Sequence, residues 1–174
     1  MSLWTEFFRS LSQPEYVHIL LNPLPVYGLA AGLFALLVAA LARSRPGQSL
    51  ALVLILLGAV SAWPVMKYGH AGYDRVYSMS NDTAQKWLNW HMHLGETLVW
   101  IDAAAAALAA IALLATWRFE RFRRLAVVLT AIVALAGLGF GGFVGFVGGK
   151  IRHSEFRSGP PPAWANTKSD DDED

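Results

Sequence analysis

Long uncharged apolar runs alternate with short polar segments along this chain. Three of these runs contain no Asp, Glu, Lys or Arg: 24–41, 50–66 and 125–147. Each is close to the roughly 20 residues that a helix needs to cross the hydrocarbon core of a bilayer. A fourth run, 94–117, includes Glu96 and Asp102 but is otherwise apolar. We interpret all four as transmembrane helices, which predicts an all-α, integral membrane four-helix bundle that forms one domain over residues 1–157.

The two ends of the chain follow different patterns. Near the N-terminus, apolar residues recur at helical spacing: Leu3, Trp4, Phe7, Phe8 and Leu11. This stripe predicts a short helix that lies in the membrane interface and ends at Pro14. The segment 158–174 begins with Gly159 and three prolines and closes on five acidic residues. Such a composition predicts a disordered, acidic C-terminal tail.

Composition supports a membrane protein and excludes several other classes. The 174 residues are 55% apolar and 16% charged, with a mean hydropathy of +0.37, whereas soluble proteins carry about 25% charged residues. The chain has no cysteine, which excludes disulfides, thiolate metal sites and covalent c-type haem. A net charge of +1 without a basic stripe argues against nucleic-acid binding. The sequence also lacks a Ser or Cys nucleophile motif.

Charge in the short connections predicts the orientation. Segment 43–49 carries two arginines, and segment 118–124 carries four arginines and one glutamate. The positive-inside rule places both connections in the cytoplasm. In a bacterial inner membrane, both termini and the predicted loop 67–93 would then face the periplasm.

Five histidines flank the predicted spans: His18, His70, His91, His93 and His153. Because the number of spans is even, all five are expected on one membrane face. Histidines are common at membrane interfaces, since imidazole has an apolar body and a polar tip. Their gathering on one face also suits a site for haem b, or for a transition metal (Cu, Fe or Zn) with Glu96 as a further ligand. The alternative is that no cofactor is bound.

The third span divides these candidates between two sides of one helix. At roughly 100° per residue, His93, Glu96 and Trp100 share a sector, and His91 and Asp102 lie almost opposite. Glu96 is placed to accept a hydrogen bond from the His93 ring, as carboxylates beside ligand histidines do, or to be a ligand or proton carrier itself. For Asp102, a helix-packing hydrogen bond to another span and a proton or quinone role are both open.

The fourth span contains a row of glycines at intervals of four residues: Gly137, Gly141, Gly145 and Gly149. Such a row predicts close helix packing, for example against 103–107. A sharper interpretation is a groove for a flat macrocycle, with His153 at the end of the row as an axial ligand and Glu155 beside it. The candidate axial pairs are then His70 with His153 and His93 with His153.

Several short patterns point to a family. They are Val17-His18-Ile19-Leu20-Leu21-Asn22, Tyr68-Gly69-His70, the stretch 91–96, and Gly148-Gly149-Lys150-Ile151-Arg152-His153-Ser154-Glu155. Through them, residues 17–157 resemble a family of small four-span bacterial membrane proteins labelled as a domain of unknown function. Some of its members are fused to Rieske iron–sulfur modules. This chain has Pro23 where the family often has a second histidine. The resemblance implies a place near electron transfer.

Together these observations predict a membrane subunit with a histidine-lined haem b or metal site. We expect it to transfer electrons within a larger complex of membrane or periplasmic redox subunits. The alternative is a non-catalytic accessory subunit that docks its neighbours through the N-terminal helix, the aromatic loop and the acidic tail. A transporter is disfavoured, because four spans with one or two buried acids offer little machinery for alternating access.

Overall fold

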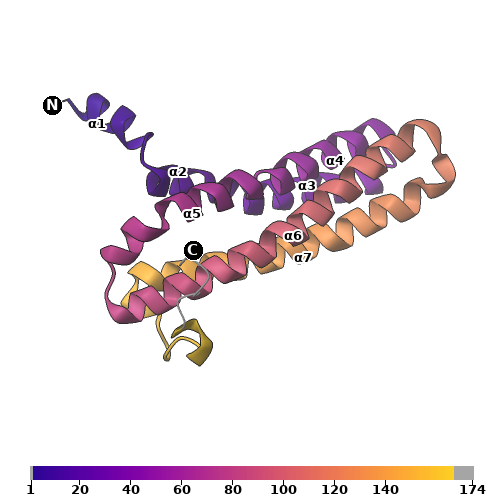
Figure 1. The fold of residues 1–174 in the computed structure, drawn as a ribbon. Helices are drawn as coiled ribbons and strands as arrows, with labels where there is room; N and C mark the ends of the chain where they lie inside the picture. The colour runs from indigo at the N-terminus through magenta and orange to yellow at the C-terminus, as the bar shows by residue number, and fades with distance from the viewer. Residues whose placement is uncertain (1, 167–174) are drawn as a thin grey trace, which may run out of the picture.

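The computed structural model describes residues 2–166, apart from the side chains at 116–118, 120, 121, 164 and 166. The described part of the chain is helical and has no strand. Its elements are α1 (Leu3–Ser10), α2 (Pro14–Leu21), α3 (Pro23–Leu41), α4 (Arg45–Val60), α5 (Ala62–Ser78), α6 (Asp82–Arg118), α7 (Glu120–Arg152) and the 3-10 turns η1 (Ser154–Phe156) and η2 (Ala163–Asn166). Figure 1 shows the long helices lying side by side as one bundle.

Four stretches of helix are long and apolar enough to cross a membrane. They are Pro14–Leu41, Arg45–Ser78, Asp82–Ala115 and Phe122–Arg152. The first joins α2 to α3, and the second joins α4 to α5. The prediction of an all-α bundle with four spans is therefore confirmed, and the chain is a multi-pass membrane protein. Its sidedness and its host membrane stay predictions.

The helices extend well beyond the apolar runs that identified them. The prediction of a loop over 67–93 was wrong, because α5 and α6 occupy almost all of this segment and only 79–81 connect the two helices. The side chain of Asn81 caps α6 by accepting a hydrogen bond from the amide of Ala84, which is a common way to begin a helix. Hydropathy detects only the lipid-facing part of a helix, so polar and aromatic turns that pack on a neighbouring helix are missed.

Glycines allow the backbones of α3 and α4 to approach each other closely. A Cβ on Gly28 would lie 2.6 Å from the Cα of Gly58, and one on Gly32 would lie 2.8 Å from the backbone nitrogen of Ile55. The two backbones are therefore in contact, as small residues permit in membrane helices. Leu29 and Ile55 lie in the core that these helices form with α6 and α7.

The glycine row of α7 does not form one continuous packing surface. Gly137 packs against Asp102 of α6, and Gly141 packs against Val26 and Leu98. A Cβ on Gly145 would meet no atom within 4 Å, so this position is open. The predicted close packing is thus present only in the inner half of the row.

His153 does not extend the glycine row, contrary to the prediction. Helix α7 ends at Arg152, and His153 has an extended backbone, with φ of −102° and ψ of 93°. Its side chain is therefore no longer in helical register with Gly149. The chain then turns through η1, which contacts α7, and reaches η2, which packs on α6.

The two terminal segments differ in how they contact the bundle. Helix α1 stands apart from it in Figure 1 and buries no residue, with Leu3 83% and Trp4 73% exposed. The N-terminal helix is thus present, although it ends before Pro14, which opens α2. Its place in the membrane interface stays a prediction. Order extends further into the predicted tail than the sequence indicates, because η2 packs on α6 and buries Ala165. The acidic residues 170–174 lie outside the described residues.

Candidate functional site

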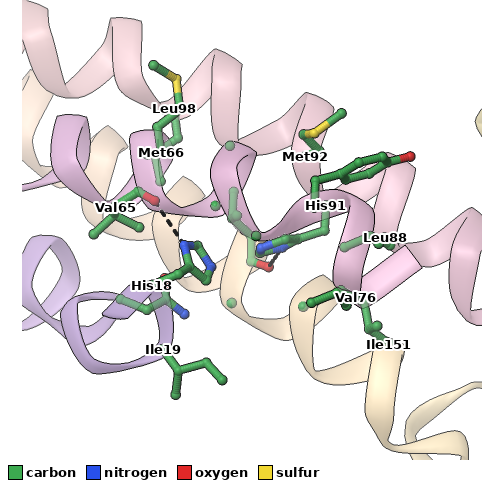
Figure 2. Close-up of a pocket in the computed structure, with 18 of the residues that line it drawn as sticks. His18, Ile19, Val65, Met66, Val76, Leu88, His91, Met92, Leu98 and Ile151 are labelled. Atoms are coloured by element: carbon green, nitrogen blue, oxygen red, sulfur yellow. Dashed lines mark hydrogen bonds between the residues drawn. The ribbon is translucent and has the colours of Figure 1, made fainter. Parts of the chain in front are cut away.

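A cavity of about 330 Å³ lies between α2, α5, α6 and α7, in the half of the bundle that carries the histidines (Figure 2). Its volume is within the range of about 300 to 1,000 Å³ that holds small-molecule ligands. The wall is mainly apolar and includes seven glycines: Gly69, Gly72, Gly95, Gly141, Gly145, Gly148 and Gly149. The polar and charged side chains in the wall are Glu15, His18, Asn22, His70, Tyr73, His91 and Arg152. Such a wall suits a flat, largely apolar ligand with a few polar attachment points.

His18 reaches the cavity from α2. Its Nδ1 lies 2.9 Å from the carbonyl oxygen of Val65 in α5. A carbonyl can only accept, so in the neutral ring Nδ1 carries the proton and Nε2 keeps its lone pair. The ring lies against Gly69, where a Cβ would be 3.1 Å from Nδ1 and from Cε1. The position of this imidazole is therefore fixed by both a hydrogen bond and close packing.

Close contacts also hold the whole of α2 on α5. A Cβ on Gly72 would lie 2.9 Å from the backbone nitrogen of Glu15. The carboxylate of Glu15 makes an ion pair with Arg75 at 2.7 Å, one turn further along α5. The short helix is thereby fixed at two points, which places His18 over the cavity.

His91 is arranged in the same way on the other side. Its Nδ1 lies 3.1 Å from the carbonyl oxygen of Val144 in α7. Gly148, one turn further along α7, leaves the space for the ring, since a Cβ there would be 2.9 Å from Cε1 of His91. The bond to Val144 again assigns the proton to Nδ1 and leaves a lone pair on Nε2.

The two imidazoles form a pair. Their ring centroids are 6.2 Å apart and their planes are nearly perpendicular, at 83°. Figure 2 shows them side by side in the cavity, each with its dashed bond to a carbonyl. Within residues 2–166, neither Nε2 has a hydrogen-bond partner. Each ring of the pair therefore has one nitrogen without a partner among the described residues.

The structure places the other predicted histidines differently. His70 also lines the cavity, and its Nε2 lies 3.2 Å from Oε1 of Glu96, with both side chains about half exposed. The His93 side chain is exposed and does not line the cavity. Glu96, which was expected beside His93, thus contacts His70. The proposed axial pairs that include His153 are not brought together around the cavity.

His153 has its own partners outside the bundle. Its Nδ1 lies 2.9 Å from Oε1 of Glu155, and its ring stacks on Phe156 with centroids 4.9 Å apart. A hydrogen bond from the residue's own backbone amide, and a second one from His153, hold the pKa of Glu155 below its usual value. This exposed pair is the contact that was predicted for Glu155, but it lies away from the cavity.

Asp102 is fully buried in α6, and a hydrogen bond to another span, one of the two roles that the sequence left open, is absent among the described residues. Neither carboxylate oxygen has a hydrogen-bond partner there, and the side chain lies against Gly137. Leu98, one turn along α6, lines the cavity. Asp102 is therefore a buried acid just beneath the cavity floor.

A metal cage made of protein groups alone is not present in the described part of the chain. No group of three or more His, Cys, Asp or Glu side chains comes close enough together to hold one ion. In Figure 2 the side chains of Met66 and Met92 extend away from the two imidazoles. Among the described residues, His18 and His91 thus have no third His, Cys, Asp or Glu beside them that would complete a metal site.

Sequence reasoning missed this pair for a definite reason. The sequence analysis placed His91 on the face of α6 opposite His93. It interpreted the glycine row as the groove for a macrocycle and chose His153, paired with His70 or His93, as an axial ligand. The signal that could have found the pair is Gly148, which neighbours the row without belonging to it. His18 becomes a partner only because α2 folds back on α5, which hydropathy does not indicate.

Comparison of the chain with protein-family models, curated proteins and solved structures found no match. The resemblance to the four-span family therefore stays a prediction.

Proposed function

We propose that the protein binds one haem b between His18 and His91 and is an electron-transfer subunit of the membrane. The observation that carries this proposal is the pair itself. Each ring has its Nδ1 at a backbone carbonyl, which leaves both Nε2 atoms in one cavity without a protein partner within residues 2–166. Ligand histidines are usually oriented in this way, through a hydrogen bond from the nitrogen that does not bind the metal.

The separation of the rings supports axial binding from opposite sides of one ion. With a metal–nitrogen bond of about 2.0 Å and a ring radius of about 1.1 Å, two opposed imidazoles have centroids about 6.2 Å apart. A tetrahedral arrangement would bring the same centroids to about 5 Å. The distance in this protein is 6.2 Å. It agrees with the opposed arrangement of a six-coordinate haem.

The shortage of protein ligands favours haem over a bare ion. Structural zinc sites take four protein ligands and catalytic zinc sites take three, whereas haem iron needs only one or two because the macrocycle supplies the other four. The described residues supply two. The glycine-rich wall gives room for a flat ring, with Gly95 and Gly145 open to the cavity. Arg152 lines the same cavity and would pair with a haem propionate.

Two axial histidines leave haem iron no free position for a small molecule. Such a haem exchanges electrons rather than activating oxygen or a substrate. We therefore assign the protein to electron transfer, with membrane quinol and a further redox subunit as the expected donor and acceptor. We place it in a bacterial inner membrane with the histidine half on the periplasmic side.

A second function, that of an accessory subunit without a cofactor, is favoured by another consequence of the same hydrogen bonds. The hydrogen bonds of His18 and His91 each join two helices, α2 to α5 and α6 to α7. Both histidines would then serve only to hold the bundle together. This function predicts a protein that folds fully without haem.

An optical spectrum of the purified protein separates the two functions. We expect a Soret band, and α and β bands after reduction, in wild type and in the H153A control. H18A and H91A should lose these bands, and added imidazole should restore them where the variant is folded. Colourless wild-type protein from cells supplied with haem, or full haem content in both H18A and H91A, would overturn the proposal.

A further inference from the structure

Asp102 is an ionisable group that the haem proposal does not use. It lies eleven residues beyond His91 on the same helix, which is about 16 Å along the axis. Its side chain has no exposed surface, and both oxygens lack a hydrogen-bond partner within the described residues. An acid in the middle of a membrane helix is costly and, as a rule, has a function.

The elements packed around Asp102 offer it no charge. On α7, the segment 125–149 has no ionisable residue, and its buried Thr130 donates to the carbonyl of Ala126. On α3 the only ionisable group is Tyr27, which is 72% exposed, and on α4 it is Arg45, at the end of the helix. No cation therefore faces the carboxylate from the described parts of these helices.

The surroundings favour the neutral acid over the carboxylate. An ionised group in an apolar interior is strongly penalised unless a partner offsets its charge. Asp102 packs against Gly137 of α7 and belongs to the region of the alanine-rich core. Its proton is thus held inside the membrane.

Asp102 lies close enough to the cavity for a charge in the cavity to affect its proton. Leu98 and Val99 of α6 line the cavity, and Asp102 follows them by about one helical turn. The iron and macrocycle of oxidised haem carry one positive charge, and those of reduced haem carry none. In a medium of low dielectric constant, the positive charge of oxidised haem acts on a carboxylate that lies one helical turn from the cavity wall. It stabilises the carboxylate only while the haem is oxidised.

We propose that Asp102 is a proton-binding site in the membrane interior that takes up a proton when the haem is reduced. One electron from the donor would reduce the bound haem and one proton from water in the cavity would join the Asp102 carboxylate, so that the charge of this region is unchanged. On oxidation the electron leaves to the acceptor and the proton returns from Asp102 to the same water. This inference rests on the proposed function for its redox step but not for the proton site itself.

Infrared spectroscopy tests the proton site in haem-free protein, and in protein with reduced haem, because neither contains the oxidised haem that stabilises the carboxylate. We expect the C=O band of a protonated carboxylic acid that shifts in heavy water and is absent from D102N. The matched control is E96Q, which changes the acid paired with His70 at the bundle surface and should keep the band. A spectrum without this band in folded wild-type protein that is haem-free or reduced would overturn the inference and would leave the haem proposal intact.

A redox titration at several pH values then tests the coupling. In wild type and E96Q, the midpoint potential should fall by up to about 59 mV per pH unit over the range in which the oxidised form loses its proton. In D102N it should not depend on pH in that range. Equal pH dependence in wild type and D102N would overturn the coupling. Absence of haem in every variant would overturn the proposed function, and the infrared band would still decide whether Asp102 holds a proton.

Discussion

Gly148 lies directly against the imidazole of His91, so that a Cβ at this position would be 2.9 Å from the ring. We predict that G148A displaces the ring, breaks its bond to Val144 and lowers haem content severalfold. Haem content per mole of purified protein measures the effect. The matched control is G142A, because a Cβ there meets no atom within 4 Å. Equal haem content in G148A and wild type would show that His91 does not need this space.

The contact between Gly58 and the backbone of α3 leads to a second prediction. A Cβ on Gly58 would lie 2.8 Å from the carbonyl carbon of Gly28 and from the amide nitrogen of Leu29. Backbone atoms cannot move aside as a flexible side chain can. We therefore expect G58A to lower the free energy of unfolding by about 1–3 kcal/mol. Thermal unfolding in detergent, compared with G139A as an open-position control, measures this loss.

Lys150 gives a third prediction, because its ammonium group is almost buried between two aromatic rings. The nitrogen lies 4.5 Å from the centroid of Trp87 and 4.6 Å from that of Phe146. A desolvated cation–π contact contributes about 2 kcal/mol. K150Q should therefore lower the Tm, and K150R should retain most of it. Identical Tm values for K150Q and wild type would show that the contact contributes nothing.

The exposed pair of His153 and Glu155 predicts a modest pH dependence. The pKa of Glu155 is lowered in the folded protein, so its stabilising contribution is present above the ordinary pKa of the carboxyl group. That contribution is lost as the pH falls through the lowered pKa. E155Q should thus have a slightly lower Tm than wild type at neutral pH, and the two should converge in acid. A Tm difference that grows on acidification would contradict this assignment.

Apolar runs were sufficient to predict the bundle, because lipid exposure requires uninterrupted hydrophobic residues over most of each span. They could not predict where α5 and α6 begin and end, since those turns pack against protein and tolerate polar side chains. Counting the spans predicted that the histidines lie at one end of the bundle, but it did not predict that His18 pairs with His91. His18 and His91 meet through the fold of α2 onto α5, which depends on Gly69, Gly72 and the Glu15–Arg75 ion pair. None of these contacts has a periodic signature.

The hydrogen bond from His91 to Val144 also determines when the site can form during synthesis. His18 belongs to the first span to be made, and Val144 to the last. A ribosome must therefore finish nearly the whole chain before both rings are held in position. Haem would then be inserted into a completed bundle, and a chain that lacks its fourth span would enter the membrane but stay colourless.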